Sequence, residues 1–525
     1  AELVTGTRSP LDFTKIMGKP VTLEVAPPGG QVRYLNGLVR SFLEARQDHE
    51  FIYYRAEIVP TFWLWTLQVQ SRIFQQLSVA QILEQVLDKL RPHVRFALVG
   101  QYRPRAYCVQ YRESDFAFAS RLMEEEGIYY FFEHKKDSHV LVVTDSLTGC
   151  KDHEPGTVHF DDAEGEQRPE SRITRWHKRQ TIRSNRYTLT DYHFEMPEYD
   201  LKASVTLGED VQAGQATHSL QTKITNGPDL EHTDFPGDFA KRYDGINPDG
   251  AAQMSELQHL FEDNERAARL RAQQQAARAL VCEGEGTCGT FLPGHKFRLD
   301  RHFSGNGEYL LTSVEHTCPP SYDFQSGSQG GLDYRNRFEA LPVAVPFRPQ
   351  CLTPRPQVVG PQTAVVVGPK DAEIFLDKYG RVKVQFHWGR HGQSEDQWSC
   401  WVRVAQLWAG NNWGAFFWPR VGHEVVVLFT EGDPDQPLIV GSVYNQKNLP
   451  PVQLPEDSML AGIKSCIFTG DPNTTFNAIV FHDNPEAEYV HVHSEKTDMS
   501  NSMCNKVQYV PKSNYQFHGN FPGMS

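Results

Sequence analysis

The sequence predicts a mainly β (α+β) protein of several domains, and three observations support this fold class. Gly and Pro are frequent, with 39 and 33 residues among 525, which favours turns and short strands over long helices. Residues 381–388 alternate between two faces as a strand does. Residues 371–447 hold about five short apolar runs separated by Gly, Asn and Asp clusters, which is typical of a small barrel of the OB type.

Length and charge narrow the class of protein further. A chain of 525 residues is long enough for about three or four domains. Its formal charge of −13, from 52 basic and 65 acidic residues, disfavours nonspecific binding to nucleic acid or to anionic membranes. No stretch approaches the length of an apolar membrane span, and no basic segment followed by an apolar run begins the chain. We therefore expect neither a membrane helix nor a secretory signal.

The nine cysteines do not form a recognisable framework. They are odd in number and widely scattered, and no pair has the Cys-x-x-Cys spacing. Cys282 and Cys288 are the closest pair, and their spacing fits no common zinc site. We expect free thiols, buried or half-buried, in a reducing compartment.

Residues 1–345 are predicted to be strand-rich with three helices. Ser78 and Gln81 form a capping box, with Leu77 and Ile82 at the staple positions, so a helix begins there. A second helix covers Ser114–Glu126 and ends at Gly127, a residue that favours the left-handed backbone after a helix. Strands are expected at 128–132 and 140–143, and a loop at 152–166. A third helix is expected over Met254–Leu280, whose arginines indicate a solvated face rather than a basic binding surface.

Composition changes twice towards the C-terminus. Prolines recur from 341 to 369 and argue against a regular helix or central strand, so residues 346–370 are predicted to be an extended linker. Residues 371–447 then form the OB domain, with strands expected at 381–388, 401–405, 423–429 and 438–444. Residues 448–525 contain one alternating strand at 489–494 and too little apolar surface for a core of their own. We expect this last segment to need partners.

No pattern of residues predicts catalysis, a cofactor or a metal. The nucleotide-binding and hydrolase motifs that carry such chemistry are absent from the sequence. His491 and His493 share a strand face, but two histidines are not a metal site, and a surface or interface role is the better interpretation. Glu124, Glu125 and Glu126 follow one another at a helix end, so they are expected to fan apart rather than act as a catalytic pair.

Six of the nine tryptophans lie in the predicted OB domain. Aromatic side chains on such barrels can stack nucleic-acid bases, but that function also needs a positive groove. Residues 371–447 carry seven basic against nine acidic residues, so nucleic-acid binding is disfavoured. We expect these tryptophans to fill the core and to contact another protein surface.

The predicted barrel contains a specific series of short motifs: Asp377–Trp388, Ser399–Gln406, Trp413–Gly414, Pro419–Val427, Glu431–Pro437 and Gly441–Asn445. Through these stretches the sequence resembles the OB domain of the VgrG family, the spike proteins of type VI secretion. Short stretches at 71–75, 110–115, 121–122, 126–130 and 292–297 resemble the N-terminal part of the same family. The motif residues are Gly380, Arg381, Trp401, Trp413, Gly414, Pro419, Arg420, Gly422, Glu424, Gly432, Asp433, Pro434, Gly441 and Asn445. The interpretation as turn or close-approach positions covers six of them: Gly380, Gly414, Pro419, Gly422, Gly432 and Gly441.

The resemblance implies an architecture and a function. It implies a pair of phage-tail-hub-like barrel domains over residues 1–345, the OB barrel, and the start of a trimeric β-helical needle over 448–525. The expected function is that of a non-enzymatic, puncturing spike: a homotrimer that caps a Hcp-type hexameric tube, contacts baseplate proteins, and carries a PAAR-type tip protein and effectors. Such a protein is assembled in the bacterial cytoplasm and secreted without a signal peptide. It contacts the target membrane only during puncture and binds no nucleic acid.

The C-terminus departs from the family pattern. The long needle with Val- and Gly-rich repeats is not visible, so the needle is either truncated or of another form. The alternatives in function are a tail spike of a phage or another contractile injection particle and, with much less support, a glycan or peptidoglycan hydrolase. The hydrolase would need a convergent pair of carboxylates, for which the sequence offers no candidate.

Overall fold

The computed structural model describes residues 1–5, 11–25, 32–49, 51–162, 171–208, 210–221, 224, 227–318, 334–389 and 398–500. The chain divides into two units, Ala1–Val443 and Tyr444–Ser525, which are treated separately below. Strands far outnumber helices in both, so the mainly β fold class is confirmed. Within the described residues, no helix combines the length and apolar character needed to span a lipid bilayer.

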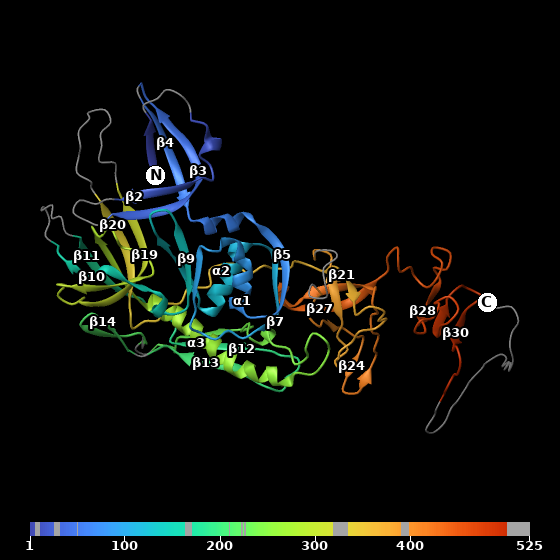
Figure 1. Ribbon diagram of the computed structural model, residues 1–525. Helices are drawn as coiled ribbons and strands as arrows, with labels where there is room; N and C mark the ends of the chain where they lie inside the picture. Colours follow the sequence, from blue (N-terminus) through green and yellow to red (C-terminus); the bar gives the residue numbers. More distant parts are fainter. Residues whose placement is uncertain are drawn as a thin grey trace. The chain divides into compact units, whose positions relative to one another are not determined.

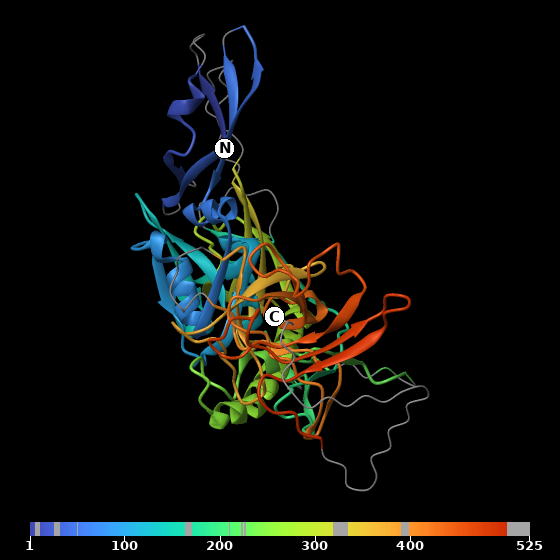
Figure 2. The same ribbon diagram turned by 90° about the vertical axis from the view of Figure 1, so that its right-hand side faces the viewer.

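The first unit begins with a four-stranded antiparallel sheet. Its strands are β1 (Glu2–Thr5), β2 (Pro20–Val25), β3 (Arg33–Gln47) and β4 (Ile52–Val59), in the order β1-β4-β3-β2. Val39, Phe42 and Tyr54 form the centre of a small core on one face of this sheet. Figure 1 and Figure 2 both show the sheet standing apart from the rest of the unit, which it meets along β3.

Two helices and two small sheets follow, and here the local predictions hold. Helix α1 (Val79–Val86) begins with the predicted capping box: Ser78 Oγ accepts from the Gln81 amide at 3.3 Å, and Gln81 Oε1 accepts from the Ser78 amide at 2.9 Å. Helix α2 (Asp115–Glu126) ends at Gly127 with φ +70. The surrounding strands are β5 (Val69–Leu77) with β7 (Arg105–Ser114), and β6 (Val94–Ala97) with β9 (His139–Thr144) and β8 (Tyr129–His134).

A closed six-stranded barrel forms the next part of the unit. Its strands are β10 (Lys151–Phe160), β11 (Arg172–Gln180), β17 (Leu280–Gly286), β20 (Arg335–Pro342), β19 (Gly307–Thr317) and β18 (His295–Asp300), in that order. Strand β10 shows that the loop predicted at 152–166 is wrong as far as Phe160, because a polar segment there pairs with β18 and buries His153 and Val158. Residues 163–166 lie outside the described part.

A side module covers this barrel region. It consists of β12 (Arg186–Asp191), β13 (Leu201–Thr206) and β16 (Glu231–Asp234), the hairpin β14 (Asp210–Ala213) and β15 (Ala216–Ser219), and helix α3 (His259–Ala279), which packs on β12 and β13. The predicted third helix is confirmed, with a 3-10 turn over Met254–Gln258 at its start. Arg269 and Arg278 are exposed as expected, whereas Arg266 is half-buried and forms ion pairs with Glu126 and Asp263.

The predicted OB barrel is a five-stranded sheet whose ends meet. Its order is β22 (Lys383–Phe386), β21 (Gln362–Val367), β26 (Glu424–Phe429), β27 (Pro437–Val443) and β23 (Arg403–Val404). Val382 and Val402 exchange backbone hydrogen bonds of 3.0 and 2.7 Å, which join the two ends of the sheet. Val384, Phe386 and Val427 are fully buried in its core.

Strand β21 lies inside the segment predicted to be a linker without strands, so that prediction is wrong for residues 362–367. The strand is even central, because β22 pairs with one of its edges and β26 with the other. Pro361 and Pro369 flank the strand rather than interrupt it, which leaves its amide groups free to donate to both neighbours. The OB barrel therefore begins near residue 362 rather than at 371.

The second unit contains one antiparallel sheet, β28 (Leu460–Lys464), β29 (Ala478–His482) and β30 (Tyr489–His493). Strand β30 confirms the predicted alternating strand. Ala478 is the only fully buried hydrophobic residue among the described residues of this unit, while Phe481, Tyr489 and Val492 are all exposed. The described part of the unit thus has almost no core of its own. Residues 501–525 lie outside the described part of the unit.

Candidate functional site

The OB barrel is fixed to the rest of the first unit by Arg381, which is almost fully buried. Its Nε donates to Asp377 Oδ2 at 2.6 Å, and its two terminal nitrogens donate to the two oxygens of Asp244, each at 2.9 Å. Asp377 belongs to the barrel and Asp244 to the side module. The side of the barrel that carries Arg381 is thus an interface between the two modules.

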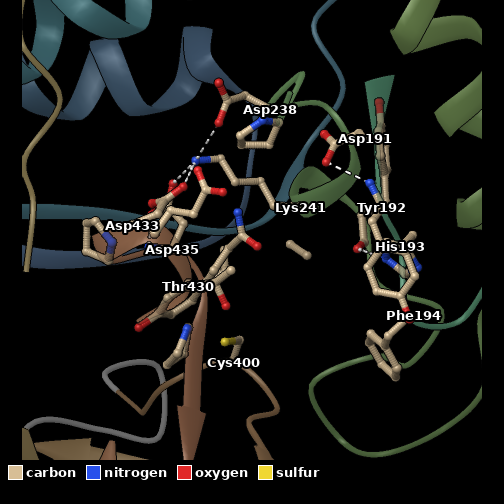
Figure 3. Close-up of a pocket in the computed structure, with 18 of the residues that line it drawn as sticks. Asp191, Tyr192, His193, Phe194, Asp238, Lys241, Cys400, Thr430, Asp433 and Asp435 are labelled. Carbon is tan, nitrogen blue, oxygen red and sulfur yellow. Dashed lines mark hydrogen bonds and ion pairs between the residues drawn. The ribbon is translucent and has the colours of Figure 1, made fainter. Parts of the chain in front are cut away.

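A second contact between the same two modules is centred on Lys241. Its Nζ lies 3.5 Å from Asp238 and 3.4 Å from Asp435, and it also forms an ion pair with Asp433. Asp435 in turn accepts a hydrogen bond of 2.7 Å from the Val109 amide of β7. Figure 3 shows the Lys241 side chain reaching towards Asp433 and Asp435, with Tyr192, His193 and Phe194 on the opposite side of a cavity.

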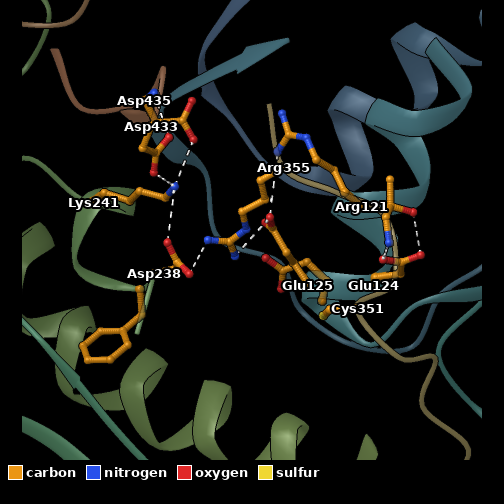
Figure 4. Close-up of polar contacts among 12 residues, drawn as sticks. Arg121, Glu124, Glu125, Asp238, Lys241, Cys351, Arg355, Asp433 and Asp435 are labelled. Carbon is orange, nitrogen blue, oxygen red and sulfur yellow. Dashed lines mark hydrogen bonds and ion pairs between the residues drawn. The ribbon is translucent and has the colours of Figure 1, made fainter. Parts of the chain in front are cut away.

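Arg355 extends this contact into a continuous network of ion pairs. Its guanidinium group pairs with Asp238 and lies 3.4 Å from Glu125 at the end of α2. Figure 4 shows Arg355 between the Lys241 cluster and the carboxylates of α2. Six basic side chains face seven acidic ones in this network: Arg105, Arg121, Lys241, Arg242, Arg266 and Arg355 with Glu113, Glu125, Glu126, Asp238, Asp263, Asp433 and Asp435.

The carboxylates at the end of α2 diverge less than predicted. Arg105 forms ion pairs with both Glu125, at 3.0 Å, and Glu126, at 2.6 Å. The two terminal nitrogens of its planar guanidinium group each reach one of these successive helical residues. Glu126 also pairs with Arg242, at 3.3 Å, and with Arg266. Only Glu124 turns away from the other two. The expectation that these three residues fan apart is therefore wrong for Glu125 and Glu126, which meet at one guanidinium group.

The network stabilises charge within the protein interior. Burial raises the pKa of Glu126, but the three guanidinium groups around it outweigh burial and hold the pKa at about 2. Burial also opposes the charge of Lys241, yet Asp433 and its neighbours raise the pKa of Lys241 above its ordinary value. Lys241 lowers the pKa of Asp433 against the effect of burial, whereas burial wins at Asp435 and raises its pKa. Removing one partner from buried pairs of this kind is costly, because the other charge is left in the interior without compensation.

The segment between β20 and β21, residues 343–361 and here called the strap, is extended as predicted but is held along its length. Arg348 donates to the Gly127 carbonyl at 3.1 Å. The Leu352 and Thr353 amides both donate to the Glu124 carboxylate at 2.9 Å. At its far end the Val358 amide donates to the Gly432 carbonyl of the OB barrel at 2.8 Å. The strap is therefore a fastened connection and not a free tether.

Removing the Glu124 carboxylate should loosen the strap. Glu124→Ala eliminates two backbone hydrogen bonds and one to Thr353 Oγ1, and we expect a loss of about 1–3 kcal/mol in the free energy of unfolding. Urea denaturation measures this loss, and limited proteolysis should show faster cleavage between residues 343 and 361. Glu84 on α1 is exposed, so Glu84→Ala is the control and should change stability by less than about 0.5 kcal/mol. Equal cleavage of both variants would contradict the role of Glu124.

A cavity of about 500 Å³ lies between the side module and the OB barrel. Its lining includes Lys241, Arg355, Arg381, Asp238 and Asp433, and each of these side chains is already engaged in an ion pair. Their charges are therefore balanced within the protein. These five side chains thus hold the two modules together across the cavity.

Several motif residues occupy turns of the OB barrel. Gly380 has φ +71, and a Cβ at this position would lie 2.3 Å from the Trp418 ring, so both backbone and space require glycine. Gly414, with φ +144, approaches the Trp408 carbonyl equally closely. Gly422 and Gly432 also have positive φ. Gly441 has neither property: it lies within β27, beside a register shift, with no atom within 4 Å of an added Cβ. Its interpretation as a turn or close-approach position is wrong.

The two kinds of glycine can be separated by mutation. Gly380→Ala combines the cost of a left-handed backbone, about 1–2 kcal/mol, with a clash against Trp418. Gly422→Ala carries only the backbone cost, because nothing lies within 4 Å of its added Cβ. Thermal unfolding should therefore show that Gly380→Ala destabilises the protein more than Gly422→Ala does, by at least about 1 kcal/mol. Equal effects would mean that Trp418 moves aside freely.

The remaining motif residues differ in their surroundings. Trp401 is buried, and its Nε1 donates to the Asn247 carbonyl of the side module at 2.8 Å. Trp413 is exposed and lies edge-on to Trp408 at 4.9 Å. Pro419 and Pro434 are buried, and Glu424 begins β26. The Arg420 guanidinium pairs with the Glu373 carboxylate at 3.4 Å. The Asn445 side chain, in the second unit, accepts hydrogen bonds from the Lys447 and Asn448 amides. The predicted core role of the tryptophans thus holds for Trp401 but not for the exposed Trp413.

The histidines of the second unit and the described cysteines are the last candidate residues. His491 is exposed, and His493 lies 3.7 Å from Glu495. Among the described residues, no group of three or more His, Cys, Asp or Glu side chains is arranged to hold a metal ion. The eight described cysteines are free thiols; Cys318 and Cys351 are exposed, contrary to the expectation that all are at least half-buried.

These features define a class of protein: a β scaffold whose ionisable side chains lock a hub-like region to an OB barrel. Comparison with family models agrees with this class. Residues 2–319 match the phage tail baseplate hub model (GPD), and residues 362–444 match the type VI secretion system/phage-baseplate injector OB domain. The second match begins at β21, where the structure also starts the barrel. The chain belongs to the VgrG family of type VI secretion system spike proteins.

Sequence relatives support this assignment over most of the chain. The spike protein VgrG1c of Pseudomonas aeruginosa is 36% identical over 94% of this chain and 64% of its own length. VgrG1a of the same bacterium is 36% identical over 93% of this chain and 71% of its own length. VgrG3 of Vibrio cholerae is 32% identical over 93% of this chain and 45% of its own. The chain thus spans between about half and two thirds of the length of most of these relatives.

Solved structures show the same fold at low sequence identity. An Escherichia coli component of the type VI secretion system, described as similar to the bacteriophage T4 tail proteins gp27 and gp5, superposes with a TM-score of 0.54. It shares 17% identity and covers 84% of this chain and 91% of its own. The Francisella PdpA-VgrG complex gives a TM-score of 0.54 at 7% identity, covering 94% of this chain and 81% of the other.

Proposed function

We propose that this chain is the structural spike of a type VI secretion machine: a hub that caps the secreted tube, punctures the target membrane and delivers effectors. The observation that carries this proposal is the 36% identity over 94% of the chain with proteins named as type VI secretion spikes. The fold is compatible with that task, because its ionisable side chains are used to hold modules together.

The spike acts without catalysing a reaction and without a cofactor. In the described part of the chain, the buried carboxylates Glu125, Glu126 and Asp433 are paired with basic side chains rather than presented to a substrate. A glycan hydrolase would need two carboxyl groups facing a common cleft. The paired geometry therefore supports a mechanical role over hydrolysis.

The functional form is a homotrimer with further protein partners. The second unit supports this, because its sheet exposes apolar side chains such as Phe481 and Val492 and would bury them against equivalent strands of other copies. The other partners are a Hcp-type hexameric tube, baseplate proteins, a PAAR-type tip protein and effectors. The protein is assembled in the bacterial cytoplasm and leaves the cell with the tube, and it binds no nucleic acid.

Two measurements test this function. Light scattering on a size-exclusion column, at micromolar concentration, should give a mass near three times the chain mass of 59.8 kDa. In the bacterium that encodes the chain, deletion of its gene should abolish release of the tube protein into the medium, and the intact gene should restore it. Unchanged release of the tube protein after deletion, with no second spike gene expressed, would refute the function.

A further inference from the structure

The OB barrel carries an aromatic hairpin whose large side chains the described residues of the first unit leave mostly exposed. The hairpin, residues 407–418, contains β24 (Ala409–Gly410) and β25 (Trp413–Gly414). Figure 1 shows it at one end of the barrel. Six of its large apolar side chains are exposed: Leu407 by 90%, Trp408 by 65%, Trp413 by 57%, Phe416 by 70%, Phe417 by 52% and Trp418 by 37%.

The hairpin is preformed. The Ala415 amide donates to the Trp408 carbonyl at 2.9 Å, and the Phe417 amide donates to Gln406 Oε1 at 2.9 Å, so both ends of the turn are fixed. The rings of Trp408 and Trp413 pack edge-on at 4.9 Å. Because these contacts already order the aromatic side chains, a partner could dock on them with little further loss of conformational entropy.

The exposed surface is large enough for a specific protein interface. Aromatic side chains each carry roughly 150–250 Å², so the exposed fractions of these six residues present apolar surface on the order of 700 Å². The largest apolar patch on a typical monomer is about 300–600 Å², whereas a stable interface buries about 800 Å² on each partner. The hairpin therefore has the extent of one side of an interface.

The hairpin has no charged side chain, and this excludes nucleic acid and anionic membranes as its partner. Residues 404–419 contain no Asp, Glu, Lys or Arg. Nucleic acid and anionic lipid headgroups are bound through basic side chains, which this segment lacks. The complementary surface must therefore be apolar.

The same barrel offers such a surface on the outward face of β26 and β27. The outward side of an antiparallel pair is normally polar, but here Leu428, Val440 and Val443 are each exposed by about 40%. Gly441 lies among them and pairs with Val426. Since nothing stands within 4 Å of an added Cβ at Gly441, the face is flat there and open to a ring placed on it.

We propose that the hairpin 407–418 of one copy of this chain packs on the outward β26–β27 face of the next copy. Two different surfaces on the same module make a head-to-tail contact between identical copies, and such contacts close into a ring when the rotation between copies is right. This inference rests on the proposed assembly of the spike from several copies, and it assigns the contact that joins their OB barrels. Gly441 keeps the receiving face flat.

Photo-cross-linking of the full chain tests the contact. The photoreactive residue p-benzoylphenylalanine replaces Trp413, which is exposed and tolerates another aromatic group. The cross-linked peptides are mapped by mass spectrometry, in the presence of phosphatidylcholine vesicles. The control is the same residue at Phe303, which is 86% exposed on the six-stranded barrel. We expect cross-links from position 413 to residues 424–443 of another copy, and none to that face from position 303.

The outcomes separate this inference from the proposed function. A trimeric mass with cross-links from position 413 to any other surface, or with none, overturns the docking and leaves the spike function standing. Lipid adducts at position 413 in place of a second copy overturn it as well and indicate a membrane contact. A monomeric mass at micromolar concentration overturns the docking together with the proposed trimer.

Discussion

Arg381→Met is expected to lower the free energy of unfolding by about 3–5 kcal/mol, because it leaves two buried carboxylates without their partner. Arg381 donates to both Asp377 and Asp244, and the side chains of these residues are 0% and 14% exposed. Methionine fills most of the volume but supplies no donor. The loss should also weaken the hold of the OB barrel on the side module, since Asp244 belongs to that module.

Chemical denaturation measures the first effect, and limited proteolysis followed by mass spectrometry locates the second. The expected new cleavage sites lie around residues 244 and 377. Arg40→Met is the control, because Arg40 pairs with Glu57 at the surface, where both side chains are about half exposed, and its removal should change stability by less than about 1 kcal/mol. Similar losses for the two variants would show that Arg381 is not an anchor.

Glu126→Gln is the second change with a large expected effect. Glu126 is 5% exposed and balances three guanidinium groups, those of Arg105, Arg242 and Arg266. Glutamine keeps the shape but not the charge, so three neighbouring cations lose their common partner. We expect a loss of about 3–5 kcal/mol at neutral pH. Glu57→Gln provides the matched control at the surface, where the same change should be nearly neutral.

The dependence of stability on pH gives a sharper test of the same residue. The folded pKa of Glu126 is held at about 2, below its unfolded value, so its contribution is present above about pH 4.5 and is lost as the pH falls towards 2. A shift of that size corresponds to about 3 kcal/mol. The difference in unfolding free energy between the wild type and Glu126→Gln should therefore shrink as the pH falls from 4.5 to 2. A difference that stays constant would contradict the depressed pKa.

The sequence predicted local features well, in particular where helices begin and end. Ser78 and Gln81 are three residues apart and cap α1 as their types require, and Gly127 ends α2 with the left-handed backbone that favours glycine. Two of the wrong predictions concern strands. Residues 151–160 are polar and form a strand only because β18 and β11 pair with them, and residues 362–367 form a central strand between prolines. Such pairing depends on segments distant in sequence, so local composition does not contain it.

The network between the modules was missed for the same reason. Asp433 was selected as part of a motif, but its partner Lys241 lies 192 positions away. Asp244 and Arg381 are 137 positions apart. Arg355 left one local signal, since it stands between Pro354 and Pro356 in a segment with few other charges. A long basic side chain in an extended strap is expected to seek an acidic partner, but the sequence alone does not say which one.

Under the proposed spike function, in which the chain is pushed towards a target membrane, the strap has a mechanical consequence. Its backbone and side chains are fastened at Gly127, at Glu124, at the Arg355 ion pairs and at Gly432. A force applied to the OB barrel is therefore shared among several hydrogen bonds and ion pairs along the strap. No single peptide bond has to bear the whole thrust, and the joint between barrel and hub behaves as a strut rather than as a hinge.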